Sequence, residues 1–251
     1  MLLKRVMPCL LFNGRGLIKT VRFKQPAYVG DPINVIKIFN EKEVDELILL
    51  DINASKEKRK PAFDKIKEYA SECFMPFTYG GGVSDLSDFR HLFSIGVEKV
   101  AVNTLLLSHP DIVKQAVELY GAQAIIGVID VKMNSNGKMI PFNKTDLKIS
   151  HDLVSYCNYL QNEIGVGEIL LQNADREGTW AGFDHEFIRS FLPFAKVPVI
   201  VLGGANAPVD IKKVLYETGA NAAAIGSMAV YQKKDMGVLI RFPKRESIII
   251  E

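Results

Sequence analysis

Residues 124–132 read AIIGVIDVK, a run of six apolar or small residues that ends at Asp130. An unbroken apolar run of this length is typical of a strand that is buried on both faces, as in a parallel sheet. Folds built on such sheets place their chemistry at the carboxyl ends of the strands. The alternative is that Asp130 only caps the following loop, but similar strand ends recur along the chain and favour a functional acid.

Seven further apolar runs resemble this stretch, and amphipathic segments of helical length separate them. The other expected strands are residues 6–12, 46–51, 76–79, 99–102, 168–172, 197–202 and 221–226. The expected helices include residues 61–72, 84–94, 111–120, 152–163 and 208–218. Eight strands alternating with helices in 251 residues predict an α/β fold of the (β/α)8 TIM barrel type. A doubly wound sheet, which fits about six strands better, is the alternative.

An internal repeat divides the expected barrel into two parts. The pair Gly80-Gly81 matches Gly203-Gly204, and residues 94–104 match residues 217–227, always at an offset of 123. A constant offset predicts one domain over residues 1–251 that is built from two similar (β/α)4 halves, about 1–122 and 123–251. Long segments follow the first and fifth strands, at residues 13–31 and 131–145. They are expected to be irregular and to act as equivalent mobile lids over one mouth.

Composition excludes several classes of function. The net charge of +2 offers no electrostatic case for nucleic-acid binding. No apolar run has the length of a membrane span, and no signal peptide precedes the first strand, so we expect a cytoplasmic protein without a membrane partner. The three cysteines (Cys9, Cys73 and Cys157) lie far apart, which predicts a reducing compartment and no disulfide framework. We expect neither a metal site nor a cofactor.

Glycines and small polar residues follow four of the expected strands. They are Gly81, Gly82, Asn103 and Thr104 after the third and fourth strands, and Gly203, Gly204, Gly226 and Ser227 after the seventh and eighth. Glycines let backbone N–H groups approach an anion, and a helix N-terminus behind them adds a favourable dipole. One glycine pair alone indicates only a tight turn, whereas two sets in register predict a ligand with phosphate-like groups at both ends.

Three carboxylates lie at or just after strand ends, namely Asp51, Asp130 and Asp175. Carboxylates held over a barrel mouth can perform acid–base chemistry once burial or neighbours adjust their pKa values. Lys19, in the first long segment, is placed to meet an anionic ligand. A solvated loop lysine is an equally good interpretation of Lys19.

Four charged residues, in contrast, lie at strand starts: Arg5, Glu46, Lys99 and Glu168. Strand starts form the bottom face of a barrel, where residues normally serve stability. Two acids and two bases could form a balanced ring about the barrel axis. From the pattern alone, four ordinary surface charges are the simpler interpretation.

Together these residues resemble, from end to end, the cyclase subunit of imidazole glycerol phosphate synthase. The matching segments include KRVMPCL at 4–10, DEL at 45–47, LDI at 50–52, PFT at 76–78, GGG at 80–82, NT at 103–104, GEILL at 167–171, DR at 175–176 and GT at 178–179. The resemblance implies a two-half (β/α)8 barrel that forms a heterodimer with a glutaminase subunit. It also implies that ammonia passes through the barrel to cleave and cyclise a bis-phosphorylated substrate into imidazole glycerol phosphate and an aminoimidazole carboxamide ribotide.

The resemblance also assigns roles to individual residues. Arg5, Glu46, Lys99 and Glu168 match the family's charged ammonia gate, at a bottom face that docks the glutaminase. The two glycine sets match its two phosphate sites, and Lys19 matches its mobile-loop lysine. Asp51, Asp175 and Gly178 fall in matching segments and are grouped with the substrate-binding residues.

One departure concerns the catalytic pair. The family works with two catalytic aspartates, one ending the first strand and one ending the fifth. Asp130 is the second, but Leu11 stands where the family has the first, and leucine cannot transfer a proton. Divergent relatives found beside surface-polysaccharide (lipopolysaccharide) genes are thought to deliver ammonia for sugar amidination by a separate ATP-using amidotransferase. This chain resembles one of them.

Two alternatives stay open, and with them the question of whether this barrel is itself an enzyme. The first is a working cyclase of histidine biosynthesis in which another group replaces the missing acid. The second is a non-catalytic barrel that scaffolds the glutaminase and conducts ammonia.

Overall fold

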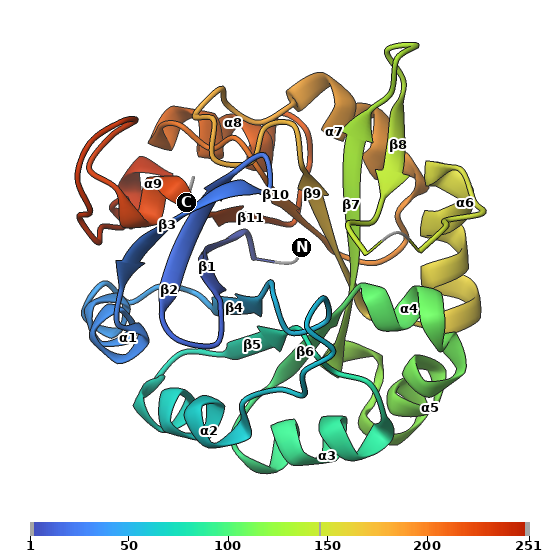
Figure 1. Cartoon of the computed structure of the whole chain (residues 1–251). Coiled ribbons are helices and arrows are strands. Elements are labelled where there is room, and N and C mark those ends of the chain that lie inside the picture. Colours follow the sequence, from blue (N-terminus) through green and yellow to red (C-terminus); the bar gives the residue numbers. More distant parts are fainter. Residues whose placement is uncertain (1–2, 146, 249–251) are drawn as a thin grey trace.

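The computed structural model describes residues 3–145 and 147–248, and it shows a closed barrel of parallel strands ringed by helices (Figure 1). The barrel strands are β1 (Arg5–Phe12), β4 (Leu47–Asp51), β5 (Phe77–Gly80), β6 (Lys99–Val102), β7 (Ile125–Met133), β9 (Glu168–Asn173), β10 (Val199–Leu202) and β11 (Ala222–Ile225). Each pairs with the next in this order, and β11 pairs with β1 to close the barrel. The predicted (β/α)8 barrel is therefore confirmed.

Helices connect the strands on the outside of the barrel. They are α1 (Pro32–Glu41), α2 (Phe63–Glu72), α3 (Leu86–Ser94), α4 (Thr104–Ser108), α5 (Pro110–Tyr120), α6 (Leu153–Asn158), α7 (His185–Phe191), α8 (Pro208–Tyr216) and α9 (Ser227–Val230). Aspartates begin several of them; the Asp85 carboxylate, for example, accepts hydrogen bonds from the first-turn N–H groups of Ser87 and Asp88. A π-helix (Tyr159–Ile164) continues α6, so the predicted helix at 152–163 is present with a wider final turn.

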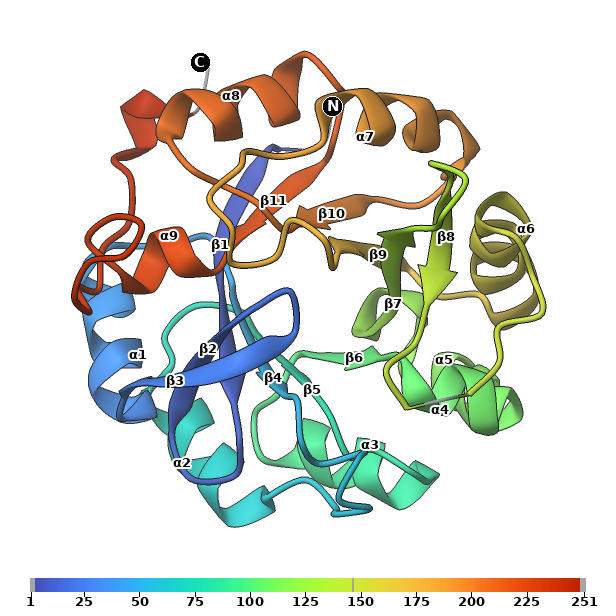
Figure 2. The ribbon, with the colours of Figure 1, turned by 45° about the horizontal axis from the view of Figure 1, so that its top comes forward.

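The two long segments after the first and fifth strands are not irregular, as the sequence led us to expect. Residues 13–31 contain β2 (Leu17–Val21) and β3 (Lys24–Gly30), which form an antiparallel hairpin on β1. In the second segment, β7 continues to Met133 and pairs with β8 (Met139–Phe142). Figure 2 shows the first hairpin crossing the barrel. The first turn was missed because Arg22 and Phe23, with φ of 52° and 59°, adopt the left-handed conformation without the usual glycine or asparagine.

Residues of the barrel strands alternate between two apolar layers. On β1, Val6 and Leu10 pack outward beneath the helices, whereas Met7 and Cys9 pack inward. The inner layer is completed by Ile48, Ala101, Ile126, Val128, Leu170, Ile200, Leu202, Ala222 and Ala224. The barrel interior is thus a packed core, and the charged and polar clusters described below lie at its two ends.

The chain beyond β11 packs against the outside of the barrel near α1. The rings of Phe242 and Phe39 meet edge to face with 6.4 Å between their centroids, and Arg245 forms an ion pair of 2.7 Å with Asp45. Ile248 is buried. Within the two described ranges, no helix combines the length and the apolar character that crossing a membrane requires.

Candidate active site and charged ring

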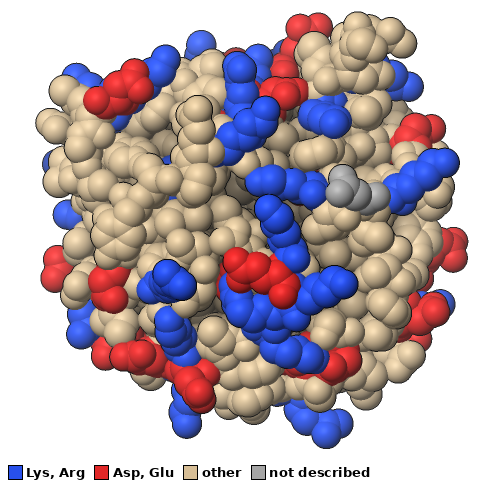
Figure 3. Space-filling model, in the orientation of Figure 1, with Lys and Arg blue, Asp and Glu red and all other residues tan. Residues whose placement is uncertain are grey.

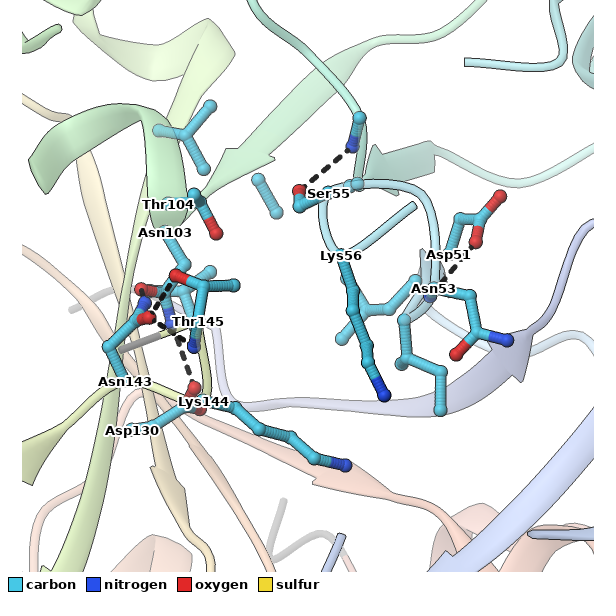
Figure 4. A pocket seen from close by; sticks show the side chains of 18 of the residues that line it. Asp51, Asn53, Ser55, Lys56, Asn103, Thr104, Asp130, Asn143, Lys144 and Thr145 are labelled. Atoms are coloured by element: carbon cyan, nitrogen blue, oxygen red, sulfur yellow. Dashed lines mark hydrogen bonds between the residues drawn. The ribbon is translucent and has the colours of Figure 1, made fainter. Parts of the chain in front are cut away.

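A cavity of about 210 Å³ opens at the carboxyl ends of the strands from β1 to β7. Its apolar floor is formed by Leu11, Leu50, Ala101 and Val128. Lys56, from the loop after β4, and Lys144, from the segment after β8, extend into it from opposite sides (Figure 4). Figure 3 shows that lysine and arginine side chains gather around the hollow of this face. The mouth therefore favours an anionic ligand with an apolar part.

The N-terminal glycine set lines this cavity. Gly81 and Gly82 adopt φ of +115° and +74°, and a Cβ on Gly81 would lie 2.2 Å from the backbone oxygen of Asp51. Both positions thus require glycine. Asn103 and Thr104 line the same cavity, so the structure brings together all four residues of the predicted first cradle.

The C-terminal glycine set is nearly filled. Gly203 and Gly204 (φ of +112° and +103°) line a space of about 20 Å³ together with Gly178, Gly226 and Ser227, which is room for about one water molecule. The Lys19 side chain lines the same space, and its Cε is 2.9 Å from where a Cβ on Gly226 would lie. This set is therefore occupied by a lysine.

The interpretation of Lys19 as a solvated loop lysine is wrong. Lys19 lies on β2 rather than in an irregular loop, it is 6% exposed, and its ammonium donates to the buried carboxylate of Glu177. Glu177 also accepts hydrogen bonds from the Thr20 hydroxyl and the Phe23 N–H, each of 3.0 Å. Glu177 thus clamps the first hairpin onto the loop after β9. Glu177 could not be identified from the sequence alone, because its partners lie more than 150 positions away.

Two of the three candidate carboxylates already have structural partners. Asp51 accepts hydrogen bonds from the Arg59 guanidinium at 2.9 and 3.1 Å, and from the N–H groups of Asn53 and Ala54. This pairing raises the pKa of Arg59 further above its usual value. Asp175 is exposed, accepts a hydrogen bond from the Met133 N–H at 2.6 Å, and lines neither cavity. Asp51 thus lies at the mouth as the partner of Arg59, and Asp175 lies outside both cavities.

Asp130 is the carboxylate that remains. Its Oδ2 accepts a 2.8 Å hydrogen bond from Asn103, while its buried Oδ1 has no partner among the described residues. Burial raises the pKa of Asp130 from 3.8 to about 7, and the Asn103 hydrogen bond opposes only part of this rise. Leu11, 4% exposed, faces the same cavity and has no group that could exchange a proton with Asp130.

The two hairpins meet above the cavity. The rings of Phe23, from the first hairpin, and Phe142, from the second, stack with their centroids 6.3 Å apart. The ammonium of Lys144 donates to the backbone oxygen of Phe23 and lies 5.9 Å from its ring centroid. The lids that the sequence placed at equivalent positions are therefore in contact with each other.

At the opposite end of the barrel, the four charged residues at the strand starts form a closed ring. Arg5 donates to both Glu46 and Glu168, and Lys99 lies 3.1 Å from an oxygen of each. Each acid thus contacts both bases. The glutamates are the more deeply buried members, with side chains 8% and 6% exposed. The interpretation as four separate surface charges is wrong.

The described residues hold no group of three or more His, Cys, Asp or Glu side chains arranged to bind a metal ion. The mouth itself offers backbone and side-chain groups to a ligand. These comprise one glycine cradle that is open, one that is filled by Lys19, two lysines and one uncompensated acid.

Comparisons with known proteins agree with this architecture. The family model described as histidine biosynthesis protein matches residues 5–235. The "Putative imidazole glycerol phosphate synthase subunit hisF2" of Pseudomonas aeruginosa is 43% identical over 244 residues, covering 97% of each chain. The "Putative imidazole glycerol phosphate synthase subunit hisF3" of Vibrio vulnificus is 40% identical over 246 residues, covering 97% of this chain and 94% of its own. The imidazole glycerol phosphate synthase subunit HisF of Methanococcus vannielii is 33% identical over 257 residues, covering 94% of each.

Proposed function

The chain belongs to the histidine biosynthesis protein family, among relatives of the imidazole glycerol phosphate synthase HisF subunit, and from this premise we propose that it is the barrel subunit of a cytoplasmic, glutamine-dependent ammonia-transfer complex. In this proposal a glutaminase subunit docks at the charged ring and ammonia passes through the barrel. The ammonia then serves the amidination of a sugar in surface-polysaccharide biosynthesis, by a separate amidotransferase. The mouth keeps a phosphate-bearing ligand but does not perform the histidine-pathway cyclisation.

Leu11 is the observation that carries this proposal. Acid–base cleavage and cyclisation use one group to donate a proton and another to accept one, and residues that act as a unit fail together. Among the described residues that line the cavity, the carboxylates are Asp51 and Asp130, and Asp51 is fully engaged by Arg59 and two backbone N–H groups. Asp130 therefore has no second unpaired carboxylate as its partner among the described residues of the mouth.

The intact ring supports the docking of a partner at the other end. Each of the four charges contacts two others, and the two glutamates are almost fully buried. Burying charged groups costs free energy unless they are paired. Apolar residues would stabilise this end of the barrel equally well, so stability alone does not explain the four charges. A ring that can open and close is consistent with a gate for a small neutral molecule such as ammonia.

A working cyclase of histidine biosynthesis is the second candidate, because two features favour it. The pKa of Asp130 lies near 7, where a general acid or base is most effective. The open cradle of Gly81, Gly82, Asn103 and Thr104 is also retained.

One assay separates the two candidates. The purified chain is given the bis-phosphorylated substrate with ammonium, beside the variants Leu11→Asp and Leu50→Asp. We expect no measurable turnover by the unaltered chain, and a gain of about 10²-fold or more for Leu11→Asp, the range of one positioned acid or base. Leu50→Asp is the matched control, because it adds an acid to the same cavity floor from β4, and it should gain nothing. Rapid turnover by the unaltered chain would contradict this proposal and support the second candidate, a working cyclase of histidine biosynthesis.

A second assay tests the partnership. Mixed with its cognate glutaminase subunit, the chain should form a complex in which glutamine hydrolysis depends on the barrel. Lys99→Glu should uncouple ammonia transfer from hydrolysis or weaken docking, because it places three acids around Arg5. Lys37→Glu, at an exposed position on α1, is the control and should behave as the unaltered chain. A fully coupled Lys99→Glu complex would contradict the assignment of the gate.

A further inference from the structure

A chain of side-chain hydrogen bonds runs from the segment after the second hairpin to Asp130 (Figure 4). The N–H and hydroxyl of Thr145 donate to Asn143 Oδ1, the former at 2.7 Å. Asn143 Nδ2 donates to Asn103 Oδ1 at 2.9 Å, and Asn103 Nδ2 donates to Asp130 Oδ2 at 2.8 Å. The series joins three parts of the fold: the segment after β8, the end of β6, and Asp130 on β7.

The direction of this series is fixed by its first bond. A backbone N–H can only donate, so the Asn143 atom that faces Thr145 must be the amide oxygen. The Asn143 NH₂ group then faces Asn103, whose amide oxygen must accept, and this turns the Asn103 NH₂ toward Asp130. Reversing either amide would bring two donors or two acceptors together. Asp130 Oδ2 is therefore held as an acceptor.

The other oxygen of Asp130, Oδ1, is the one that favours a proton. Oδ1 is buried and has no partner among residues 3–145 and 147–248, and Asp130 is one of the residues that line the mouth. An ionised carboxylate with one buried, unpartnered oxygen is unfavourable, because nothing replaces the water it has lost. A proton on Oδ1 removes this charge and leaves Oδ2 to accept from Asn103. The resulting O–H is available to a group in the cavity.

We propose that Asn143 is a positioning residue that, through Asn103, presents Asp130 to the cavity as a proton donor. The hydrogen-bond series to Asp130 forms only when the second hairpin is in place, because Asn143 directly follows β8. This proposal rests on the proposed function insofar as the mouth is the ligand site. It is independent of the identity of the glutaminase and of the final ammonia acceptor.

Other charged groups around the mouth do not explain the protonated state. Lys56 and Lys144 are cations at the rim, and cations favour an ionised carboxylate rather than a protonated one. The Asp51 carboxylate is compensated by Arg59. Burial raises the pKa of Tyr156, on α6, and the charges of Tyr159 and Asp130 add to the rise, so Tyr156 is a neutral hydroxyl. Burial of the Asp130 carboxyl remains as the cause of the protonated state, and the fixed hydrogen-bond series decides that the proton lies on Oδ1 rather than on Oδ2.

The test is an NMR titration of the full chain labelled with ¹³C-aspartate and ¹⁵N-asparagine. We expect the Asp130 carboxyl to titrate with a midpoint near 7, and the side-chain NH₂ signals of Asn103 and Asn143 to shift with the same midpoint. In Asp130→Asn, which mimics the neutral acid, both NH₂ signals should keep their positions and lose their pH dependence. An Asn143 signal that is indifferent to the Asp130 titration would overturn the proposal, and this measurement needs no variant of Asn143.

A matched pair of asparagine variants completes the experiment. Asn143→Leu keeps the branched shape and the number of side-chain heavy atoms but removes the donor to Asn103, so the hydrogen bond that favours ionised Asp130 weakens and the midpoint should rise by about half a unit or more. Asn136→Ala, at the exposed tip of the same hairpin, should leave the midpoint unchanged. An unchanged or lowered midpoint in Asn143→Leu would also overturn the proposal. None of these outcomes depends on cyclase activity, so failure here is distinct from failure of the proposed function.

Discussion

The ammonium of Lys19 lies against the carboxylate of Glu177 inside the C-terminal glycine set, so that a cation occupies the place where the fold offers N–H groups to an anion. Both side chains are almost completely buried, with 7% and 3% exposed. The remaining space holds about one water molecule, far less than a phosphate group needs. A ligand can therefore enter this end of the mouth only after Lys19 has moved.

The first prediction concerns anion stoichiometry. Inorganic phosphate should bind the unaltered chain at one site per chain, in the open cradle of Gly81 and Gly82. Lys19→Met should leave this site intact, and an added Cβ in Gly82→Ala should abolish it, because that atom would lie 2.6 Å from the Arg59 backbone oxygen. ³¹P NMR or calorimetric titration gives the count. Two equivalent sites in the unaltered chain would show that Lys19 does not block the second set.

The second prediction concerns the stability of the same ion pair. Glu177→Gln leaves the Lys19 ammonium buried without a counter-charge, which should lower the free energy of unfolding by about 3–5 kcal/mol. Lys37→Met breaks the exposed pair between Lys37 and Glu72 and should cost about 1 kcal/mol or less. Urea unfolding at neutral pH compares the two. Equal losses would mean that the buried pair contributes no more than a surface one.

The third prediction is a pH dependence of stability that depends on Asp130. Its pKa is about 7 in the folded chain and 3.8 when exposed, so between these values the folded state binds more protons than the unfolded state. The resulting stabilisation is full below pH 3.8 and is lost as the pH rises through 7. At 1.36 kcal/mol per pKa unit, the loss reaches up to about 4 kcal/mol.

Asp130→Asn provides the comparison for this prediction. It keeps the neutral hydrogen-bond pattern at every pH, so the difference in unfolding free energy between it and the unaltered chain should change between pH 5 and pH 8. The unaltered chain should be the one that loses stability. Parallel curves for the two proteins would place the Asp130 pKa outside this range.

The fourth prediction concerns the charged ring. Because Glu46 and Glu168 share both Arg5 and Lys99, their effects should not be independent. A double-mutant cycle of Glu46→Gln and Glu168→Gln should give a coupling energy of about 0.5–3 kcal/mol. Additive losses in chemical denaturation would indicate two separate ion pairs rather than a ring.

The fifth prediction concerns the contact between the hairpins. Phe23→Ala removes the stack on Phe142, worth about 0.5–1.5 kcal/mol beyond area burial. Amide hydrogen exchange should then accelerate in both hairpins, including residues 139–142, which lie far from the mutation in sequence. Tyr28→Ala, on the same first hairpin but 70% exposed, should affect only its own hairpin.

The barrel could be predicted because its strands are continuous apolar runs and glycine-bearing segments repeat at a fixed offset, and both signals can be read directly from the sequence. The positions of Arg5, Glu46, Lys99 and Glu168 at strand starts were also visible. That they converge could not be read from the pattern alone, since it requires knowing that all four point inward.

Residues whose partners depend on the hairpins could not be predicted. Glu177 and Asn143 acquire their contacts only once both long segments fold as antiparallel ribbons, and those segments were expected to be irregular. The turn at Arg22 and Phe23 lacks the residues that usually signal a hairpin. The second turn does carry such a signal, Asn136-Gly137.

The ring at the bottom of the barrel has a further consequence for the long-range field of the molecule. It contains two cations and two anions in alternation, so it has no net charge, and its potential falls off within a short distance. The ring itself therefore neither attracts nor repels distant ions. Electrostatic capture of an anionic ligand at the mouth, through Lys56 and Lys144, should in contrast slow as ionic strength rises.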